Sequence, residues 1–343
     1  MANGEIAGGP GREYQSAVKR VGLFNDTSVS GHYGCTAVMG TMVAELDARG
    51  IAPAFLWPVA TDWSAHERWV LRRRPDALIV NGEGTIHHSA ERQRTRDLLA
   101  LPALARRHDL PIHLVNASVS ELDDAAVEAL RGFTSVWVRE SESLRYLDGF
   151  GIRAQMVPDL SLGLRTTMPL EARDGIIVTD SVLRETARAL RAFAVATGAH
   201  HERMKPRRTR WDGFVEASRQ RWPGSPAATR WRSRSDPAAF AGRLARRSLA
   251  VTGRFHTVLL SIATDTPFLA CPSNTSKIEA VLTDVFGDTS RLRPVEVLDQ
   301  ATFREAALRG QPFDGRELAA LARYRAMADV ARKDMFDNLA GLA

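Results

Sequence analysis

Lysine is scarce in this sequence of 343 residues. The chain has four lysines, Lys19, Lys205, Lys277 and Lys333, so 42 of its 46 basic residues are arginine. The formal charge is +6 and the isoelectric point is about 9.8. A basic chain favours anionic partners such as nucleic acid, phospholipid or phosphorylated metabolites. Zinc-finger spacing, a recognition helix and an aromatic stacking motif are all lacking, so we expect no nucleic-acid partner.

Cysteines are few, and long apolar runs are absent. Cys35 and Cys271 are the only two cysteines, and they fit no metal-ligand spacing, so we expect reduced thiols and no metal site. No run of 18 apolar residues occurs, so we expect no transmembrane helix. The first twenty residues lack the apolar core of a signal peptide. We therefore expect a cytoplasmic protein, with residues 1–18 as a flexible, glycine-rich leader.

Strand-like and helix-like stretches alternate through the first half of the chain. VKRVGLF, DALIVNG and PIHLVNAS have the character of strands, whereas CTAVMGTMVAELDARG and SELDDAAVEAL have helical periodicity. Ser120 is the expected N-cap of the second helix. About six repeats of this alternation predict an α/β fold with a parallel, doubly wound sheet.

The alternation breaks near residue 168, at RTTMPLEARDG, and a second strand-helix series follows. We therefore predict two Rossmann-like domains that face a cleft, one over residues 19–167 and the other over residues 168–314. The last helix, in residues 315–343, has no strand after it. We expect it to cross back and pack on the N-terminal domain.

Residues 200–235 match neither series. They are rich in arginine interleaved with tryptophan and carry little apolar periodicity after residue 222. A solvated insertion and a surface that meets an anionic lipid or glycan are both compatible with this composition. The sequence leaves the role of this segment open.

Polar and titratable residues follow the predicted strands. Ligands bind at the carboxyl ends of the strands in parallel sheets, so this clustering predicts a site there. In the first half the residues are Asn25, Asp26, His32, Asn81, Glu83 and Arg139, and in the second half they are Arg254, His256, Asn274 and Lys277.

The stretch NGEGT at residues 81–85 could begin a dinucleotide fingerprint. The third glycine is absent, however, and no acidic residue stands where the ribose would need one. We therefore expect no nicotinamide cofactor. Its two glycines allow a tight turn or a close backbone approach.

Arg254 and His256 stand where a buried strand turns into an apolar helix, in VTGRFHTVLLSIATD. The N-terminus of a helix favours an anion, and a guanidinium can bind a carboxylate or a phosphate through two hydrogen bonds. A histidine can transfer a proton near neutral pH. A surface arginine beside a packed histidine would give the same pattern.

The chain resembles the polysaccharide pyruvyltransferase family over roughly residues 20 to 290. The resemblance is carried by GLFNDTSVSGHYGCTAVMGTMVAEL, DALIVNGEGTIHH, VWVRESESLRYLDGFGI, VPDLSLGL, IIVTDSV and VTGRFHTVLLSIATDTPFLACPSNTSKIEAVLTDVFG. It implies a two-domain fold like that of GT-B glycosyltransferases. It also implies transfer of a pyruvyl group from phosphoenolpyruvate to sugar hydroxyls.

The resemblance further implies a division of roles. Arg139 and Arg254 match family motifs and would bind the anionic donor, with Lys277 as a third candidate. His256 would protonate the vinyl methylene carbon, and phosphoenolpyruvate would serve as donor without a metal or a further cofactor. Glu83, Asp26 and His32 are unranked candidates for the base, while Asn81 and Asn274 are candidate substrate-binding residues.

Partners follow from the same resemblance. The acceptor would be a saccharide or lipid-linked saccharide of a bacterial surface polysaccharide. Contact with the inner membrane surface is expected instead from the basic charge, through the arginines. The oligomeric state stays open. Two alternatives remain: a GT-B-type glycosyltransferase that uses a nucleotide sugar, and a non-catalytic relative that binds glycans.

Overall fold

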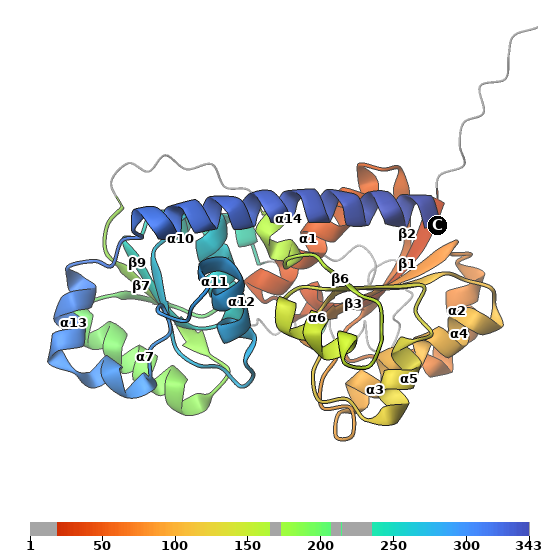
Figure 1. Ribbon diagram of the computed structural model, residues 1–343, viewed down its shortest axis with the longest axis horizontal. Helices are drawn as coiled ribbons and strands as arrows, with labels where there is room; N and C mark the ends of the chain where they lie inside the picture. The colour runs from red at the N-terminus through yellow and green to blue at the C-terminus, as the bar shows by residue number, and fades with distance from the viewer. Residues whose placement is uncertain (1–18, 165–172, 207–213, 215–234, 343) are drawn as a thin grey trace, which may run out of the picture.

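Two parallel sheets organise the protein in a computed structural model that describes residues 19–164, 173–206, 214 and 235–342. The first sheet has six strands in the order β2-β1-β3-β4-β5-β6, and the second has four in the order β10-β9-β7-β8. The sheets lie in two lobes, side by side (Figure 1). The predicted α/β fold with two Rossmann-like halves is therefore confirmed.

The first lobe alternates strands and helices. Its elements are β1 (Lys19–Asp26), η1 (Thr27–Ser30), α1 (Tyr33–Asp47), β2 (Ile51–Pro58), η2 (Ser64–His66), α2 (Glu67–Arg72), β3 (Ala77–Glu83), α3 (Gln93–Leu99), α4 (Leu101–Arg107), β4 (Ile112–Ala117), α5 (Asp124–Leu130), β5 (Ser135–Val138), α6 (Ser141–Asp148), β6 (Gln155–Met156) and η3 (Leu160–Gly163).

The second lobe follows the same rhythm and ends in a long helix. Its elements are β7 (Ile176–Ser181), α7 (Arg184–Thr197), β8 (His200–Glu202), α10 (Pro237–Ala245), β9 (Leu249–Gly253), α11 (Phe255–Ala263), β10 (Phe268–Ala270), α12 (Lys277–Phe286), η4 (Val295–Asp299), α13 (Ala301–Leu308) and α14 (Gly315–Leu342).

The strands of the first lobe are buried on both faces. Successive side chains of a strand point to opposite faces, so Leu23 packs on one side of the sheet and Phe24 on the other. Burial on both faces explains why these strands appear in the sequence as continuous apolar runs. The same pattern holds for Ile177 and Val178 in the second lobe.

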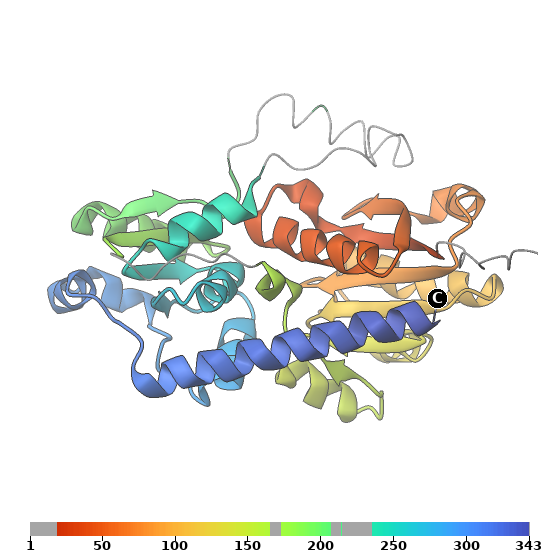
Figure 2. The ribbon, with the colours of Figure 1, turned by 90° about the horizontal axis from the view of Figure 1, so that it is seen from above.

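Helix α14 connects the two lobes. It has 28 residues, which at 1.5 Å per residue gives a length of about 42 Å, and it runs across both lobes (Figures 1 and 2). Leu321 and Tyr324 pack into the second lobe, whereas Phe336 and Leu339 pack under the first sheet. The last helix therefore crosses back to the first lobe, as predicted.

Three predicted features lie wholly or mostly outside the residues that the structure describes. The boundary near residue 168 and the leader, residues 1–18, lie outside them, and so does most of the segment 200–235. The first residues of that segment form β8, which pairs with β7 at the sheet edge. Within the described part of the chain, no helix is both long enough and apolar enough to cross a membrane.

The predicted N-cap of α5 was wrong. The helix begins at Asp124, and the side chain of Asp123 accepts a hydrogen bond from the backbone N–H of Ala126 at 2.8 Å. Ser120 lies upstream, where it forms a bridge with His87. Both serine and aspartate are good N-caps, and here the acidic run supplied the cap.

Candidate active site

The order of the strands indicates where a ligand site lies. In the first sheet, β1 has β2 on one side and β3 on the other, and in the second sheet β9 and β7 are neighbours at the corresponding change of direction. Ligands bind outside the carboxyl ends of strands at such points. A cavity of about 260 Å³ lies there, and it is lined by His32, Cys35, Glu83, Gly84, Thr85, Arg92, Arg94, Arg139, Val182, Gly253, Arg254, Phe255, His256, Ser273 and Lys277.

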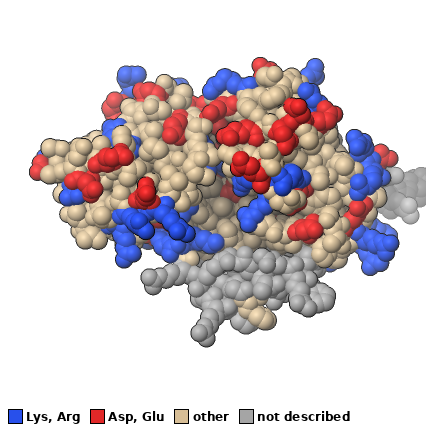
Figure 3. Space-filling view, turned by 90° about the horizontal axis from the view of Figure 1, so that it is seen from below, with Lys and Arg blue, Asp and Glu red and all other residues tan. Residues whose placement is uncertain are grey.

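Six of the predicted site residues line this one cavity: His32, Glu83, Arg139, Arg254, His256 and Lys277. The face of the molecule opposite α14 shows Lys and Arg side chains around the hollow between the two lobes (Figure 3). The cavity therefore joins titratable groups from both lobes in a basic setting.

His256 stands in the first turn of α11, directly after β9. Its Nε2 lies 3.3 Å from Oε1 of Glu83 and 3.9 Å from Oδ2 of Asp159. Both His256 Nε2 and Glu83 Oε1 are buried without a hydrogen-bond partner among the described residues. Burial lowers the pKa of His256, and the nearby carboxylates of Asp159 and Glu83 oppose that shift. An imidazole and a carboxylate thus meet across the two lobes, each with one open position.

Arg139 is held by several partners. Its Nη1 donates to Oδ2 of Asp159 at 2.8 Å, and its Nε donates to Oγ of Ser118 at 2.7 Å. The guanidinium also lies 4.4 Å from the centre of the Phe255 ring. Because Nη2 makes no hydrogen bond to a described residue, one edge of a fixed cation remains open to a ligand.

Lys277, the first residue of α12, supplies a second cation. Its Nζ would lie 3.8 Å from a Cβ added to Gly84, and Nη2 of Arg139 would lie 3.7 Å from the same point. No described residue forms an ion pair or a hydrogen bond with the Lys277 ammonium. Burial, followed by the charge of Arg139, lowers the pKa of Lys277 to about 8. Arg139 and Lys277 therefore place two positive charges beside Gly84 that acidic side chains do not fully neutralise.

Arg254 already has an acidic partner. Its Nε and Nη2 donate to the two carboxylate oxygens of Asp180 at 3.0 and 2.8 Å. Asp180 comes from β7, the strand beside β9. This two-bond contact fixes the guanidinium at the cavity wall and occupies two of its donor groups, so Arg254 can offer a ligand only its remaining edge.

Three other predicted residues lie apart from the cavity lining. Asp26 is buried and caps η1 through a 3.0 Å bond from the backbone N–H of Ser28. Asn81 is buried and donates to the carbonyl oxygen of Asn25 at 3.3 Å. Asn274 is exposed, with a 3.3 Å contact to Ser273. Asp26 and Asn81 brace the strand ends in this arrangement.

Arg92 and Arg94 line the cavity but were not among the predicted site residues. Arg92 contacts His87, and its pKa is lowered by burial and then by the charge of Arg94. Both residues stand at the start of α3, in a stretch that sequence periodicity assigned to a helix. The run of three arginines in RQRTR after His87 and His88 was the available signal.

His32 and Cys35 extend the site on the side of α1. One possible ligand atom from each of His32, Cys35 and His256 lies within 4.8 Å of the others. Nδ1 of His32, however, accepts a 3.2 Å bond from the backbone N–H of Gly34. The neutral ring then carries its proton on Nε2, so neither nitrogen offers a free lone pair. These residues as arranged do not fit a metal ion.

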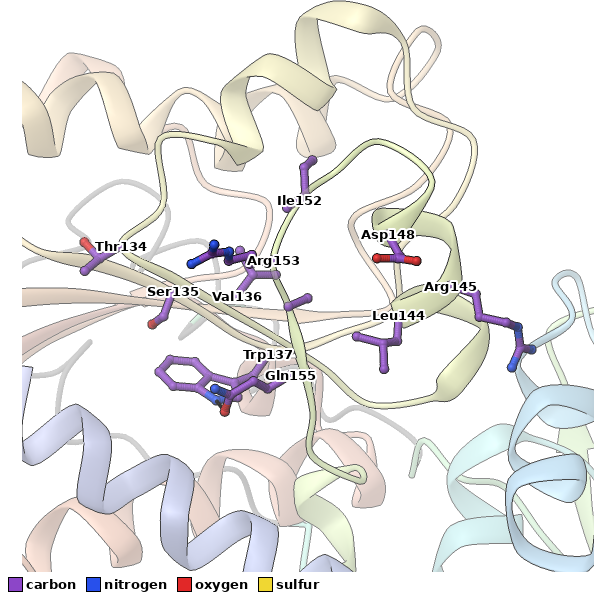
Figure 4. Close-up of a pocket in the computed structure, with 11 residues that line it drawn as sticks. Thr134, Ser135, Val136, Trp137, Leu144, Arg145, Asp148, Ile152, Arg153 and Gln155 are labelled. Carbon is purple, nitrogen blue, oxygen red and sulfur yellow. Dashed lines mark hydrogen bonds between the residues drawn. The ribbon is translucent and has the colours of Figure 1, made fainter.

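A second cavity, of about 650 Å³, lies at the edge of the first sheet between β5, α6 and β6. Trp137 and Gln155 lie together on one side of it, and Arg145 points away from them (Figure 4). Nε1 of Trp137 donates to Oε1 of Gln155 at 3.2 Å. Its walls bring no acid-base pair together, so this cavity is a weaker candidate for chemistry.

Solved structures with a similar fold include sugar-nucleotide enzymes. UDP-GlcNAc 2-epimerase from Methanocaldococcus jannaschii, in complex with UDP-GlcNAc and UDP, has a TM-score of 0.52 at 11% identity and covers 90% of this chain and 99% of its own. UDP-N-acetylglucosamine 2-epimerase from Rickettsia bellii gives 0.51 at 10% identity, with 94% and 98% covered. The glycotransferase of kitacinnamycin gives 0.50 at 10%, with 93% and 98% covered. At these identities the likeness shows the fold alone.

Sequence comparison identifies the family. No curated protein matches the chain significantly. The family model described as polysaccharide pyruvyl transferase matches residues 32–275, a range that includes His32, Glu83, Arg139 and the Arg254-x-His256 pair. Because this match spans more than half of the sequence, the chain belongs to the polysaccharide pyruvyl transferase family.

Proposed function

We propose that the protein transfers a pyruvyl group from phosphoenolpyruvate to hydroxyl groups of a saccharide. The proposal rests on one observation: an acid-base pair and two cations lie together in one cavity. The His256–Glu83 pair lies beside the two cations, Arg139 and Lys277, that flank Gly84. Acid-base chemistry on a small anion needs both groups in one place.

The cations match the charge of the donor. A phosphate group carries about −1.5 to −2 charges near neutral pH, and the carboxylate adds another negative charge. The Lys277 ammonium and the open edge of Arg139 would bind the phosphate. Arg254, held by Asp180, would add a third positive charge at the wall.

The proposed reaction begins with protonation of the vinyl methylene carbon by His256. A hydroxyl of the saccharide attacks the adjacent carbon and gives up its proton to Glu83. The carbon–oxygen bond to phosphate then breaks, and inorganic phosphate leaves with the bonding electrons. A second hydroxyl of the same sugar attacks the same carbon and closes a cyclic ketal, and its proton returns to His256. Asp26 and His32 serve less well as bases, because Asp26 caps η1 and Nδ1 of His32 is already occupied.

His256 must carry a proton to act as the acid. Burial lowers its pKa in the free protein. An opposite charge within about 4–6 Å favours the charged form of a group. The bound anionic donor would therefore raise the pKa of His256, and protonation would accompany donor binding.

The proposed acceptor is a saccharide or lipid-linked saccharide of a bacterial surface polysaccharide. The proposed location is the cytoplasm, with contact to the inner membrane surface through the arginines. Such contact must weaken with salt, because exposed charges are screened within about 10 Å at 0.1 M. Binding to anionic vesicles that persists at high salt would contradict this part of the proposal.

A thermal-shift comparison tests the choice of donor. Phosphoenolpyruvate should raise the Tm of the wild-type protein, because a ligand that binds the folded state stabilises it by mass action. UDP-GlcNAc and UDP should give smaller shifts. A shift with the nucleotide sugar alone would favour the glycosyltransferase alternative, in which the same arginines and lysine would bind a diphosphate.

A further inference from the structure

His32 has an unusual position at the start of α1. It is the N-cap of this 15-residue helix, and its ring nitrogen Nδ1 accepts a 3.2 Å hydrogen bond from the backbone N–H of Gly34. Asparagine, aspartate and serine are the common residues for this task. A histidine in this role therefore has its Nδ1 lone pair committed to the backbone.

The capping bond fixes the tautomer of the ring. A neutral imidazole has one donor and one acceptor nitrogen, so an acceptor at Nδ1 places the proton on Nε2. Burial lowers the pKa of His32 well below its ordinary value, and the charges of His256, Arg254, Lys205 and Lys277 add to the shift. Both facts make His32 a neutral donor, and the occupied lone pair excludes it as a base.

The His32 side chain stands at the cavity, next to His256. His32 lines the cavity, and its ring centre lies 5.3 Å from that of His256. His256 is 8% exposed, and its Nε2 makes no hydrogen bond to a described residue although Oε1 of Glu83 lies 3.3 Å away. Any substrate atom that reaches His256 therefore comes close to the His32 ring.

We propose that His32 is a fixed-tautomer hydrogen-bond donor that binds the carboxylate of the three-carbon donor substrate through its Nε2–H. This inference rests on the proposed function. The carboxylate carbon lies two bonds from the carbon that His256 protonates, so the two rings would hold the two ends of one small unit.

An uncharged ring at His32 favours the protonation of the neighbouring His256. A cationic residue beside His256 would oppose the protonation of His256 that the reaction requires. A neutral N–H donor orients the carboxylate without adding that repulsion. The neutral donor at position 32 thus complements Arg139 and Lys277, the two cations that would bind the phosphate.

Three variants separate the cap from the donor. Asparagine at position 32 can cap the helix through its side-chain oxygen but is too short to replace Nε2–H. His32→Asn should therefore keep the Tm of the wild type and bind phosphoenolpyruvate about 10- to 100-fold more weakly, the range for a lost hydrogen bond to a charged group. His32→Gln, whose amide reaches closer to the Nε2 position, should recover part of the affinity. His32→Ala should lose both affinity and Tm.

Inorganic phosphate, which has no carboxylate, is the matched probe. Its affinity, measured by calorimetry or competition, should be the same in His32→Asn and in the wild type. Equal weakening of phosphate and phosphoenolpyruvate would overturn the assignment of the carboxylate. Unchanged phosphoenolpyruvate affinity in His32→Asn would overturn the donor role itself.

A second readout is independent of substrate. The ¹⁵N spectrum of the histidine side chains, assigned by difference from His32→Asn, should show His32 as the neutral Nε2–H tautomer at pH 7. An imidazolium or an Nδ1–H tautomer there would overturn the inference, whatever the activity. If the tautomer is as expected and the wild type does not bind phosphoenolpyruvate, the proposed function fails and the carboxylate assignment fails with it.

Discussion

Glu83 has a strained backbone at the centre of the site. Its φ is +41°, and Asn25 and Asn116, each one residue before the end of a neighbouring strand, have φ values of +63° and +57°. Asparagine tolerates this left-handed region, whereas glutamate does so poorly. Such strain costs about 1–3 kcal/mol and often accompanies function. A glutamate at this position is best explained by the need for a carboxylate beside His256.

Replacing Glu83 should separate stability from activity. Glu83→Gly relieves the backbone strain and removes a buried carboxylate, so the free energy of unfolding should rise by about 1 kcal/mol. Pyruvyl transfer should fall about 10²- to 10⁴-fold, the range for a lost acid or base. Denaturant unfolding and a phosphate-release assay would measure both effects.

Glu83→Gln is the control for this prediction. It keeps the strain and most of the shape, so it should lose activity without a gain in stability. If Glu83→Gly were less stable than Glu83→Gln, the carboxylate would be serving the fold, and the assignment of Glu83 as base would lose its support.

Lys277 should make donor affinity depend on pH. Its pKa of about 8 means that the ammonium is charged below pH 8 and neutral above it. Proton uptake by His256 already makes phosphoenolpyruvate affinity fall as pH rises, so the fall should become steeper above about pH 8, where loss of the Lys277 ammonium adds up to a further tenfold per pH unit. Calorimetric titration between pH 7 and 9.5 would measure the fall.

Lys277→Arg offers the matched comparison, because arginine stays charged throughout this range. Above pH 8 its affinity should decline no more steeply than between pH 7 and 8, even if it is weaker at pH 7. A wild-type affinity that is flat from pH 7 to 9.5 would mean that the Lys277 ammonium does not bind the donor.

At the scale of residues, the sequence predicted six of the side chains that line the cavity but not how they pair. Glu83, His256 and Lys277 follow predicted strands, and parallel strands end at one edge. The nearest acidic partners of Arg139 and Arg254 in space, Asp159 and Asp180, are 20 and 74 residues away in the sequence. No local sequence pattern links such pairs. Only the structure shows that Asp159 and Asp180 take up hydrogen-bond donors of these arginines.

At the scale of elements, α1 and α11 pack directly against each other across the two lobes. A Cβ on Gly34, in the first turn of α1, would lie 2.1 Å from Cγ of His256. Real side chains do not approach so closely, so glycine is required at this position. The position of His256 therefore depends on a close approach between helices of different lobes.

Gly34→Ala should displace His256 without touching the substrate. Overpacking of this kind typically costs about 1–3 kcal/mol, and a misplacement of about 1 Å can reduce turnover about 10²-fold. Denaturant unfolding and the phosphate-release assay would measure the two effects together.

Gly40→Ala is the control in the same helix, because a Cβ there meets nothing within 4 Å. It should retain activity and gain about 0.5–1 kcal/mol from its higher helix propensity. A Gly34→Ala protein as active as Gly40→Ala would show that the close helix contact does not hold His256.

The elements themselves were largely predictable, because buried strands give apolar runs and amphipathic helices give a 3.6-residue period. The exceptions had weak local signals. One is β6, which comprises Gln155 and Met156 alone and pairs with the last residues of β5. The cap of α5 was misplaced because several capping residues stand in a row before it.

At the scale of the whole molecule, α14 ties the two lobes together. Phe336 is 0% exposed and packs under the first sheet, while Arg332 and Glu45 of α1 form an ion pair at 2.8 Å. Near its start, Tyr324 is buried in the core of the second lobe. The chain alternation predicted both sheets, but their approach depends on these long-range contacts, which sequence periodicity cannot show.

Phe336→Ala should destabilise the protein by about 3–5 kcal/mol, the usual cost of removing a buried phenylalanine. Val330, on the same helix, is 62% exposed, so Val330→Ala should change stability by less than about 0.5 kcal/mol. Denaturant unfolding of both variants would decide the matter. A cost below 1 kcal/mol for Phe336→Ala would mean that the end of α14 does not stabilise the first lobe.

The central claim is pyruvyl transfer at the His256–Glu83 pair, and product analysis tests it most directly. Wild-type protein would be incubated with phosphoenolpyruvate and a panel of saccharides and lipid-linked saccharides, and released phosphate and product mass would be measured together. We predict one pyruvyl ketal on the acceptor for each phosphate released, with the rate reduced about 10²- to 10⁴-fold in His256→Ala. Transfer of a sugar from a nucleotide sugar without use of phosphoenolpyruvate, or undiminished ketal formation by His256→Ala, would contradict the account.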